Sequence, residues 1–210
     1  MSSKYDNLPL DSDYLRNLEL LARAINPAER LKQINFYQHH NERIKIMSYK
    51  NGTTTESMAA MVAAMSPGLT LEDAERYAAD IAKELHEGRD VENLTLLGAF
   101  GWHNIKTAAR IWIDGPAALS GQKVVQLYHC LINPQTRDHV EIGRNEKRAL
   151  TQDFVSSDDA FKISKYEYPW IAAHYAMIAA RLDVLPCELQ AIINYVVTGE
   201  MKRNNNVVSA

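Results

Sequence analysis

The sequence has few cysteines and no long apolar run. Cys130 and Cys187 are its only cysteines and they form no CxxC pair, which excludes a disulfide scaffold and predicts a reducing, cytoplasmic setting. No segment approaches the roughly 20 apolar residues that a membrane-spanning helix needs. No apolar core follows Met1. The sequence therefore predicts neither a membrane span nor a signal peptide.

An excess of basic charge is also missing. The chain has 23 Lys and Arg against 26 Asp and Glu, a formal net charge of -3 with neutral His. This balance excludes a globally basic nucleic-acid binder, although it allows a local basic face. With 46% hydrophobic and 23% charged residues, the composition is that of an ordinary globular protein and excludes a disordered chain or a fibre.

What the sequence does contain is helical periodicity along nearly its whole length, so we predict a single all-α domain over residues 1–210. Asn26-Pro27 predicts an N-cap followed by the first residue of a long helix, whose apolar stripe from Leu31 to Met47 leads towards a turn at Asn51-Gly52. Thr70 and Asp73 have capping-box-like spacing ahead of the next apolar stripe. Met58, Met61 and Met65 lie at helical spacing, which favours a place in the core.

The middle of the chain is less regular. The apolar segment from Leu94 to Gly101 is compatible with a buried short helix or a turn, and a division into two lobes, 1–90 and 91–200, can be placed there. Two further helices are predicted, from Trp170 to Leu182 and from Pro186 to Val197. Residues 201–210 are expected to form a frayed tail.

The motifs of metal and nucleotide chemistry are absent. The seven histidines show neither HxxxH nor HExxH spacing, and no GxxxxGK loop, dinucleotide fingerprint or GxSxG elbow occurs. Solvated or internally satisfied histidines are the favoured interpretation. The sequence therefore predicts no bound metal and no cofactor.

The most informative stretch runs from Asn104 to Ala149. Its pattern predicts a helix, a short hairpin over Pro116–Gly121, a second helix carrying Lys123, a loop and a further helix. Free N–H groups and the positive dipole end at such a helix start can bind a phosphate, and a lysine adds charge there. The alternative is an ordinary pair of helices with a solvated lysine, which periodicity alone favours.

This stretch resembles the helix–hairpin–helix DNA glycosylase superfamily. In that superfamily an L-P-G-V/I-G-P/R/K-K-T-A hairpin precedes a strand-like V-D-T/R-H segment and another helix. The counterparts here are Leu119-Ser120-Gly121-Gln122-Lys123-Val124-Val125 and Val140-Glu141-Ile142-Gly143-Arg144-Asn145. The resemblance implies a helix–hairpin–helix DNA-glycosylase-like fold that binds DNA through the hairpin.

The chain also looks like a family of small, uncharacterised phage and prophage proteins, which implies a place in the host cytoplasm. The family's motifs occur here in the same order over most of the chain. They are Met65-Ser66-Pro67, Asn104-Ile105-Lys106-Thr107-Ala108, Gly121-Gln122-Lys123-Val124-Val125, Val140-Glu141-Ile142-Gly143-Arg144 and Pro186-Cys187-Glu188-Leu189-Gln190-Ala191-Ile192.

One departure from the second family concerns chemistry. Its "VTIDRHA" aspartate is Gly143 here, and glycine has no side chain to steady a sugar cation or activate a nucleophile. Lys123 lies near the nucleophilic lysine of bifunctional glycosylases, so it is the candidate catalytic residue. Asp138, Glu141 and Glu146 are the nearby carboxylates that could substitute for the aspartate.

These features support three functions, in this order. The first is a catalytically impaired, DNA-binding protein on a glycosylase-like scaffold, taking duplex DNA that is either plain or modified. The second is a helical protein–protein interaction protein that modulates a host or a defence system. The third is an active glycosylase that flips a modified base from duplex DNA. The candidate DNA contacts are Lys106, Arg110, Gly121, Gln122, Lys123, Arg144, Lys147 and Arg148.

Overall fold

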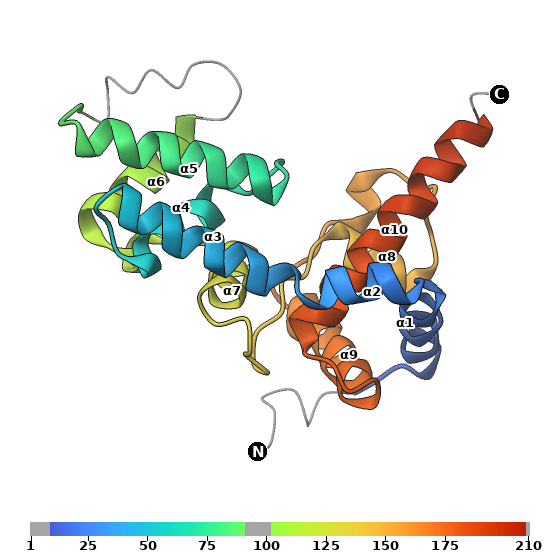
Figure 1. Ribbon diagram of the computed structural model, residues 1–210. Helices are drawn as coiled ribbons and strands as arrows, with labels where there is room; N and C mark the ends of the chain where they lie inside the picture. Colours follow the sequence, from blue (N-terminus) through green and yellow to red (C-terminus); the bar gives the residue numbers. More distant parts are fainter. Residues whose placement is uncertain (1–8, 91–101, 209–210) are drawn as a thin grey trace. The chain divides into compact units, whose positions relative to one another are not determined.

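The computed structural model describes residues 9–90 and 102–208, and it is helical (Figure 1). These residues form ten α-helices and two short 3-10 helices, with no β-strand among them. The predicted all-α class is thereby confirmed. No helix of the described part is both long and apolar enough to cross a membrane.

The elements follow one another along the chain with short connections. In order they are α1 (Ser12–Ala24), α2 (Pro27–Ile34), α3 (Phe36–Lys50), α4 (Thr55–Met65), α5 (Leu71–His86), α6 (Trp102–Asp114), η2 (Pro116–Ala118), α7 (Gln122–Ile132), α8 (Arg144–Thr151), η3 (Asp158–Phe161), α9 (Glu167–Arg181) and α10 (Pro186–Val208).

The chain divides into two compact units. The first unit combines the described residues up to Tyr37 with those from Gln135 onwards, so it contains α1, α2, α8, α9 and α10. The second unit is the continuous segment Gln38–Pro134, with most of α3 and all of α4 to α7. The chain thus leaves the first unit within α3, between Tyr37 and Gln38, and returns after Pro134.

The second unit is built around α4, which packs against α5, α6, α7 and η2 (Figure 1). Every residue from Ser57 to Met65 is buried, as expected for a helix with no charged residue after Glu56. Its methionines fill the core, which confirms their predicted role, and its alanines allow close approach of the neighbouring helices.

The first unit is built around α10, which packs against α1, α2, α8 and α9. The N-terminal half of α10 supplies an apolar face that includes Leu189, Ile192, Ile193 and Val197. Ile171, Tyr175 and Ile178 of α9 join the same core. Both C-terminal helices predicted from periodicity are therefore confirmed.

The division into units differs from the lobes placed at residues 90/91. Helices on both sides of that point belong to the second unit, because α5 and α6 each pack against α4 and against one another. The composition of the connecting segment suggested a boundary that the packing does not follow. The apolar segment from Leu94 to Gly101 lies outside the described residues.

Local capping signals were accurate predictors of helix starts. The Asn26 side chain accepts the Glu29 N–H at 2.9 Å, and Pro27 is the first residue of α2. The Thr70 hydroxyl accepts the Asp73 N–H at 3.1 Å and donates to the Asp73 carboxylate at 2.9 Å. These bonds satisfy N–H groups that a helix start otherwise leaves unpaired.

Two predicted helices have different bounds in the structure. The long helix predicted from Pro27 towards Asn51 is broken at Asn35, whose side-chain amide donates to the Leu31 carbonyl at 2.9 Å and competes with the helical backbone. At the other end of the chain, α10 continues to Val208 and does not fray from residue 201. Good helix formers such as Glu200, Met201 and Lys202, with no proline, permit that extension.

Candidate nucleic-acid interface

The predicted hairpin is present between α6 and α7. Asp114 ends α6, Gly115 adopts φ +82°, and Pro116–Ala118 form the short 3-10 helix η2. The Leu119 N–H donates to the Pro116 carbonyl at 3.0 Å, which closes the turn. Since η2 packs against both α4 and α6, the hairpin is held to the core of the second unit.

Helix α7 begins at an exposed glycine. Gly121 occupies its N-cap with φ +94°, a conformation that L side chains rarely adopt. No side chain caps the helix, and the atom nearest to a Cβ built on Gly121 is the Val124 Cγ2, at 3.9 Å. The backbone at this helix start is therefore open to close approach by a ligand.

Gln122 and Lys123 are the first two residues of α7, and both are exposed. The N–H groups of the first turn carry the positive end of the helix dipole. An ammonium group on the same turn adds to that potential. The arrangement suits a phosphate, which accepts hydrogen bonds from backbone N–H groups at helix starts.

Helix α6 contributes two more cations. Lys106 and Arg110 are exposed, and within residues 9–90 and 102–202 no carboxylate forms an ion pair with either of them. The Lys106 Nζ lies 5.1 Å from the ring centroid of Trp102, a cation–π contact that leaves the ammonium at the surface. Both cations are therefore available to an anionic partner.

The other three candidate DNA contacts are used inside the first unit. Arg148 is 2% exposed and donates to Asp158 at 3.0 Å and to the Ser156 carbonyl at 2.7 Å, with its guanidinium 4.1 Å from the ring centroid of Phe161. Its sequence position suggested a phosphate contact, but its burial makes it a structural residue. Arg144 binds the other oxygen of Asp158, at 2.9 Å.

Lys147 is likewise bound within the first unit. Its Nζ lies 2.8 Å from Glu167 Oε1 and 3.1 Å from the Lys162 carbonyl. The hydrogen bond from Lys147, with a backbone N–H from Ser164, lowers the pKa of Glu167 to about 2. These contacts join α8 to the start of α9 and leave Lys147 poorly placed to neutralise DNA.

The eight predicted residues are thus divided between the two units. Five lie in the second unit, on two helices that both pack against α4, and we call them the hairpin interface: Lys106, Arg110, Gly121, Gln122 and Lys123. Arg144, Lys147 and Arg148 lie in the first unit, where carboxylates compensate their charge.

At Gly143, where the resemblance places an aspartate, the backbone makes the contacts. Gly143 is buried, and its N–H donates to Glu146 Oε2 at 2.6 Å. Glu146 Oε1 accepts from Gln190 Nε2 at 2.8 Å. The Glu146 carboxylate is therefore occupied in capping α8 and is 3% exposed, which removes it as a substitute acid.

Tyr168 holds the residues just before Gly143. Its hydroxyl donates to the Val140 carbonyl at 2.7 Å and accepts the Ile142 N–H at 2.9 Å. This segment, which the sequence suggested was extended, is thus supported by one tyrosine and not by a neighbouring strand. Of the other two candidate acids, Glu141 is half-buried with Oε2 3.4 Å from the Tyr37 hydroxyl, and Asp138 is exposed.

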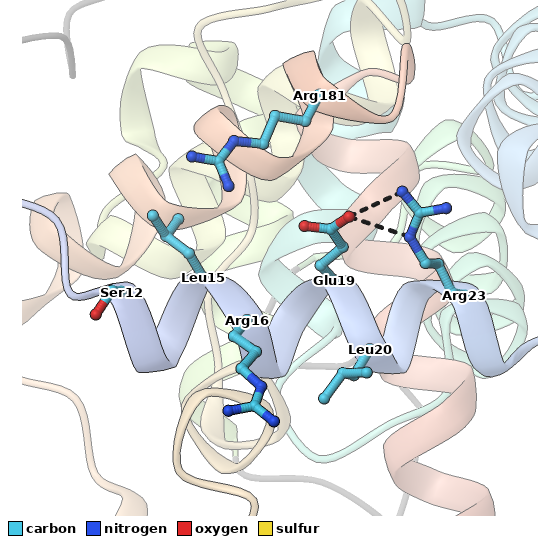
Figure 2. A pocket seen from close by; sticks show the side chains of 7 residues that line it. All are labelled: Ser12, Leu15, Arg16, Glu19, Leu20, Arg23 and Arg181. Atoms are coloured by element: carbon cyan, nitrogen blue, oxygen red, sulfur yellow. Dashed lines mark hydrogen bonds and ion pairs between the residues drawn. The ribbon is translucent and has the colours of Figure 1, made fainter.

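A shallow depression on α1 was not predicted from the sequence. Its lining includes three arginines, Arg16, Arg23 and Arg181, and the acid Glu19 (Figure 2). Arg23 Nη2 lies 2.8 Å from Glu19 Oε1, and Figure 2 shows these two side chains directed toward each other. The signal that could have found it, Arg16 and Arg23 about two turns apart on one helix, is too common to be specific.

The described residues offer no metal site: no three His, Cys, Asp or Glu side chains are grouped so that they could hold an ion. Cys130 and Cys187 are both buried free thiols.

Comparison with known proteins identifies a family. A family model described as a family of unknown function, DUF7178, matches residues 12–202, which include the hairpin interface and the Gly143 segment. No curated protein and no solved structure shows significant similarity. Because the match covers most of the chain, the protein belongs to this family, DUF7178.

Proposed function

We propose that the protein binds duplex DNA through the hairpin interface. The observation that carries this proposal is the start of α7, where an exposed glycine at φ +94° replaces any side-chain cap. A Cβ at that position would be strained, and the lack of a side-chain cap leaves the helix start open to a phosphate. The lysine on the same turn supplies the charge that duplex DNA requires of its ligands.

Helix α6 supports the same proposal. Lys106 and Arg110 stand one helical turn apart, about 6 Å along the axis, on a helix that leads directly into the hairpin. Phosphate contacts position a protein on DNA without selecting its sequence. Because the start of α7 is suited to a phosphate and not to a base edge, the expected binding is weakly sequence-selective.

The scaffold we propose is that of the helix–hairpin–helix DNA glycosylases, with its catalysis impaired. The order of helix, glycine-bearing hairpin and helix over residues 102–132 supports the scaffold. Gly143, whose backbone N–H is taken by Glu146, supports the loss of catalysis. A carboxylate near the sugar would otherwise stabilise the positive charge of the transition state.

The proposal is tested by fluorescence anisotropy of a labelled duplex at several salt concentrations. We expect binding that weakens with salt, and we expect Lys123→Ala to weaken it further and to reduce the slope of log K against log salt by about one. Lys45→Ala is the matched control, because Lys45 is an exposed lysine of the second unit on α3. Equal loss in both variants, or none in Lys123→Ala, would locate the DNA surface elsewhere.

A second candidate function rests on a different surface. Ile46 and Tyr49 lie three residues apart on α3 and are 56% and 89% exposed. Two large apolar side chains on one exposed helical face are typical of a protein-binding surface. If the protein fails to bind duplex DNA at low salt, the DNA proposal is wrong and the interaction hypothesis takes its place.

A further inference from the structure

We infer that Trp102 stacks on an unpaired base, so that the protein prefers duplex DNA with a single-stranded end over a blunt duplex. This inference rests on the proposed DNA binding and adds to it a substrate class. It starts from the ring itself: Trp102 is the first residue of α6 and is 44% exposed. An exposed indole ring offers a flat face on which a base can stack.

The other two tryptophans have contacts within the fold. Trp112 meets the ring of His86 edge-on at 6.4 Å, and Trp170 packs against Tyr14 and His174. Among the described residues, Trp102 contacts no other ring, and its cation–π partner is Lys106. Trp102 is therefore the tryptophan whose ring is open to a ligand.

The spacing on α6 determines which ligand fits. Trp102, Lys106 and Arg110 recur every fourth residue, so they lie within about 80° of the helix circumference at steps of about 6 Å. The opposite face, with Ile105, Ala108 and Ile111, is buried. An aromatic ring followed by two uncompensated cations matches a nucleic-acid strand, with one base on the ring and the phosphates on the cations.

An unpaired base fits this surface better than a paired one. Inside a duplex the faces of each base are covered by its neighbours, and a blunt end leaves only one face of each terminal pair free for a ring to stack on. A base at a single-stranded end has a free face, and stacking is tolerant of its identity because every base has one. The charge of the two cations favours this polyanion over an apolar protein partner.

The experiment compares a blunt duplex with the same duplex carrying a short thymidine overhang, by anisotropy at one salt concentration. We expect the overhang to bind at least about fivefold more tightly, since stacking one base contributes that much or more. In Trp102→Ala the ratio of the two affinities falls to about one, and in Trp102→Phe it is partly kept. Tyr166→Ala, which removes an exposed ring of the first unit, leaves the ratio as in the parent protein.

A second readout follows the tryptophan directly. The overhang quenches part of the intrinsic fluorescence of the parent protein, and this part is missing in Trp102→Phe. A parent ratio near one, or a ratio that Trp102→Ala leaves unchanged, overturns the inference while Lys123-dependent duplex binding stands. If neither DNA binds, both the inference and the proposed function fail. If Trp102→Ala instead dissociates an oligomer of the parent protein, the ring is a self-association contact and the inference is wrong.

Discussion

At the scale of single residues, the proposed loss of glycosylase chemistry depends on Gly143. Its φ of -128° is extended backbone that any residue adopts, so the glycine is not required by the local conformation. The Glu146 carboxylate lies 2.6 Å from the Gly143 N–H, so the side chain of an aspartate at position 143 would lie close to it. A second acid placed there would meet a buried like charge, which raises the cost of ionising either group.

We therefore predict no base release by the parent protein, and none by Gly143→Asp. Gly143→Asp is expected to lower the midpoint of urea unfolding, whereas Gly143→Ala, which adds bulk without charge, should lower it less. Release of base from modified duplex DNA, with strand cleavage as the readout, measures the activity. A borohydride-trapped covalent complex between Lys123 and abasic DNA would contradict the prediction, because a lysine can form that Schiff base only if it is deprotonated.

Residue identity alone could not separate the cations that face solvent from those that hold the fold. The sequence places Arg144, Lys147 and Arg148 in the same basic stretch as Lys123, yet Arg148 is buried beneath a loop and Lys147 binds Glu167. The partners Asp158 and Glu167 follow 10 and 20 residues after these two cations, so no local spacing marks the pairs.

At the scale of elements, Arg148 fastens the segment between α8 and α9. It donates to the carbonyls of Asp153 and Ser156, at 3.3 and 2.7 Å, and packs on Phe161 of η3. We predict that Arg148→Ala destabilises the protein by about 2–4 kcal/mol, since charged hydrogen bonds and a packed side chain are lost together. Urea unfolding measures this, and Arg144→Ala is the control, because Arg144 binds the same aspartate from an exposed position.

A small effect of Arg148→Ala, similar to that of Arg144→Ala, would mean that the segment keeps its place without the buried guanidinium.

The helices themselves were predictable wherever local chemistry sets their ends. The caps at Asn26 and Thr70 were found from sequence, as was the hairpin glycine. The break at Asn35 was missed, because an asparagine within an apolar helical pattern is also compatible with an unbroken helix.

At the scale of the whole molecule, one histidine links the pH to the stability of the fold. His174 is fully buried on α9, with Nε2 2.8 Å from the Asp11 N–H and Nδ1 2.9 Å from the Trp170 carbonyl. These partners fix a neutral ring that donates from Nδ1 and accepts at Nε2. Burial lowers the pKa of His174 below its usual 6.5, against the opposing effect of the Trp170 carbonyl.

We predict that the free energy of unfolding falls as the pH drops below about 6.5. In that range His174 becomes protonated in the unfolded chain but stays neutral in the folded protein. Above that pH this group has no effect. Thermal unfolding at pH 7.5 and 5.5 measures the difference, which should shrink in His174→Gln even though that variant is less stable overall. Glu167 does not contribute between pH 7.5 and 5.5. Because its pKa in the folded protein is about 2, its protonation lowers the stability only when the pH falls below about 4.5. An undiminished difference in His174→Gln would assign the pH dependence to other groups.

The whole-molecule organisation was the hardest to predict from the sequence. Periodicity gave the all-α class and the core positions of α4, α9 and α10. It could not show that the helices before residue 38 pack with those after residue 134, because helical patterns carry no information about which distant faces meet. The candidate site was only partly predictable for the same reason: the three cations after residue 143 belong to the other unit.

The discontinuous first unit has a consequence for how the chain acquires its fold as it leaves the ribosome. By the time Pro134 is synthesised, every residue of the second unit exists and its helices can collapse onto α4. The apolar sides of α1 and α2 must wait, because the helix that covers them, α10, is translated last. During that interval Leu15, Leu18 and Leu21 are exposed to water and to other chains. Slow or truncated synthesis thus leaves the apolar residues of α1 exposed for longer than those of the second unit.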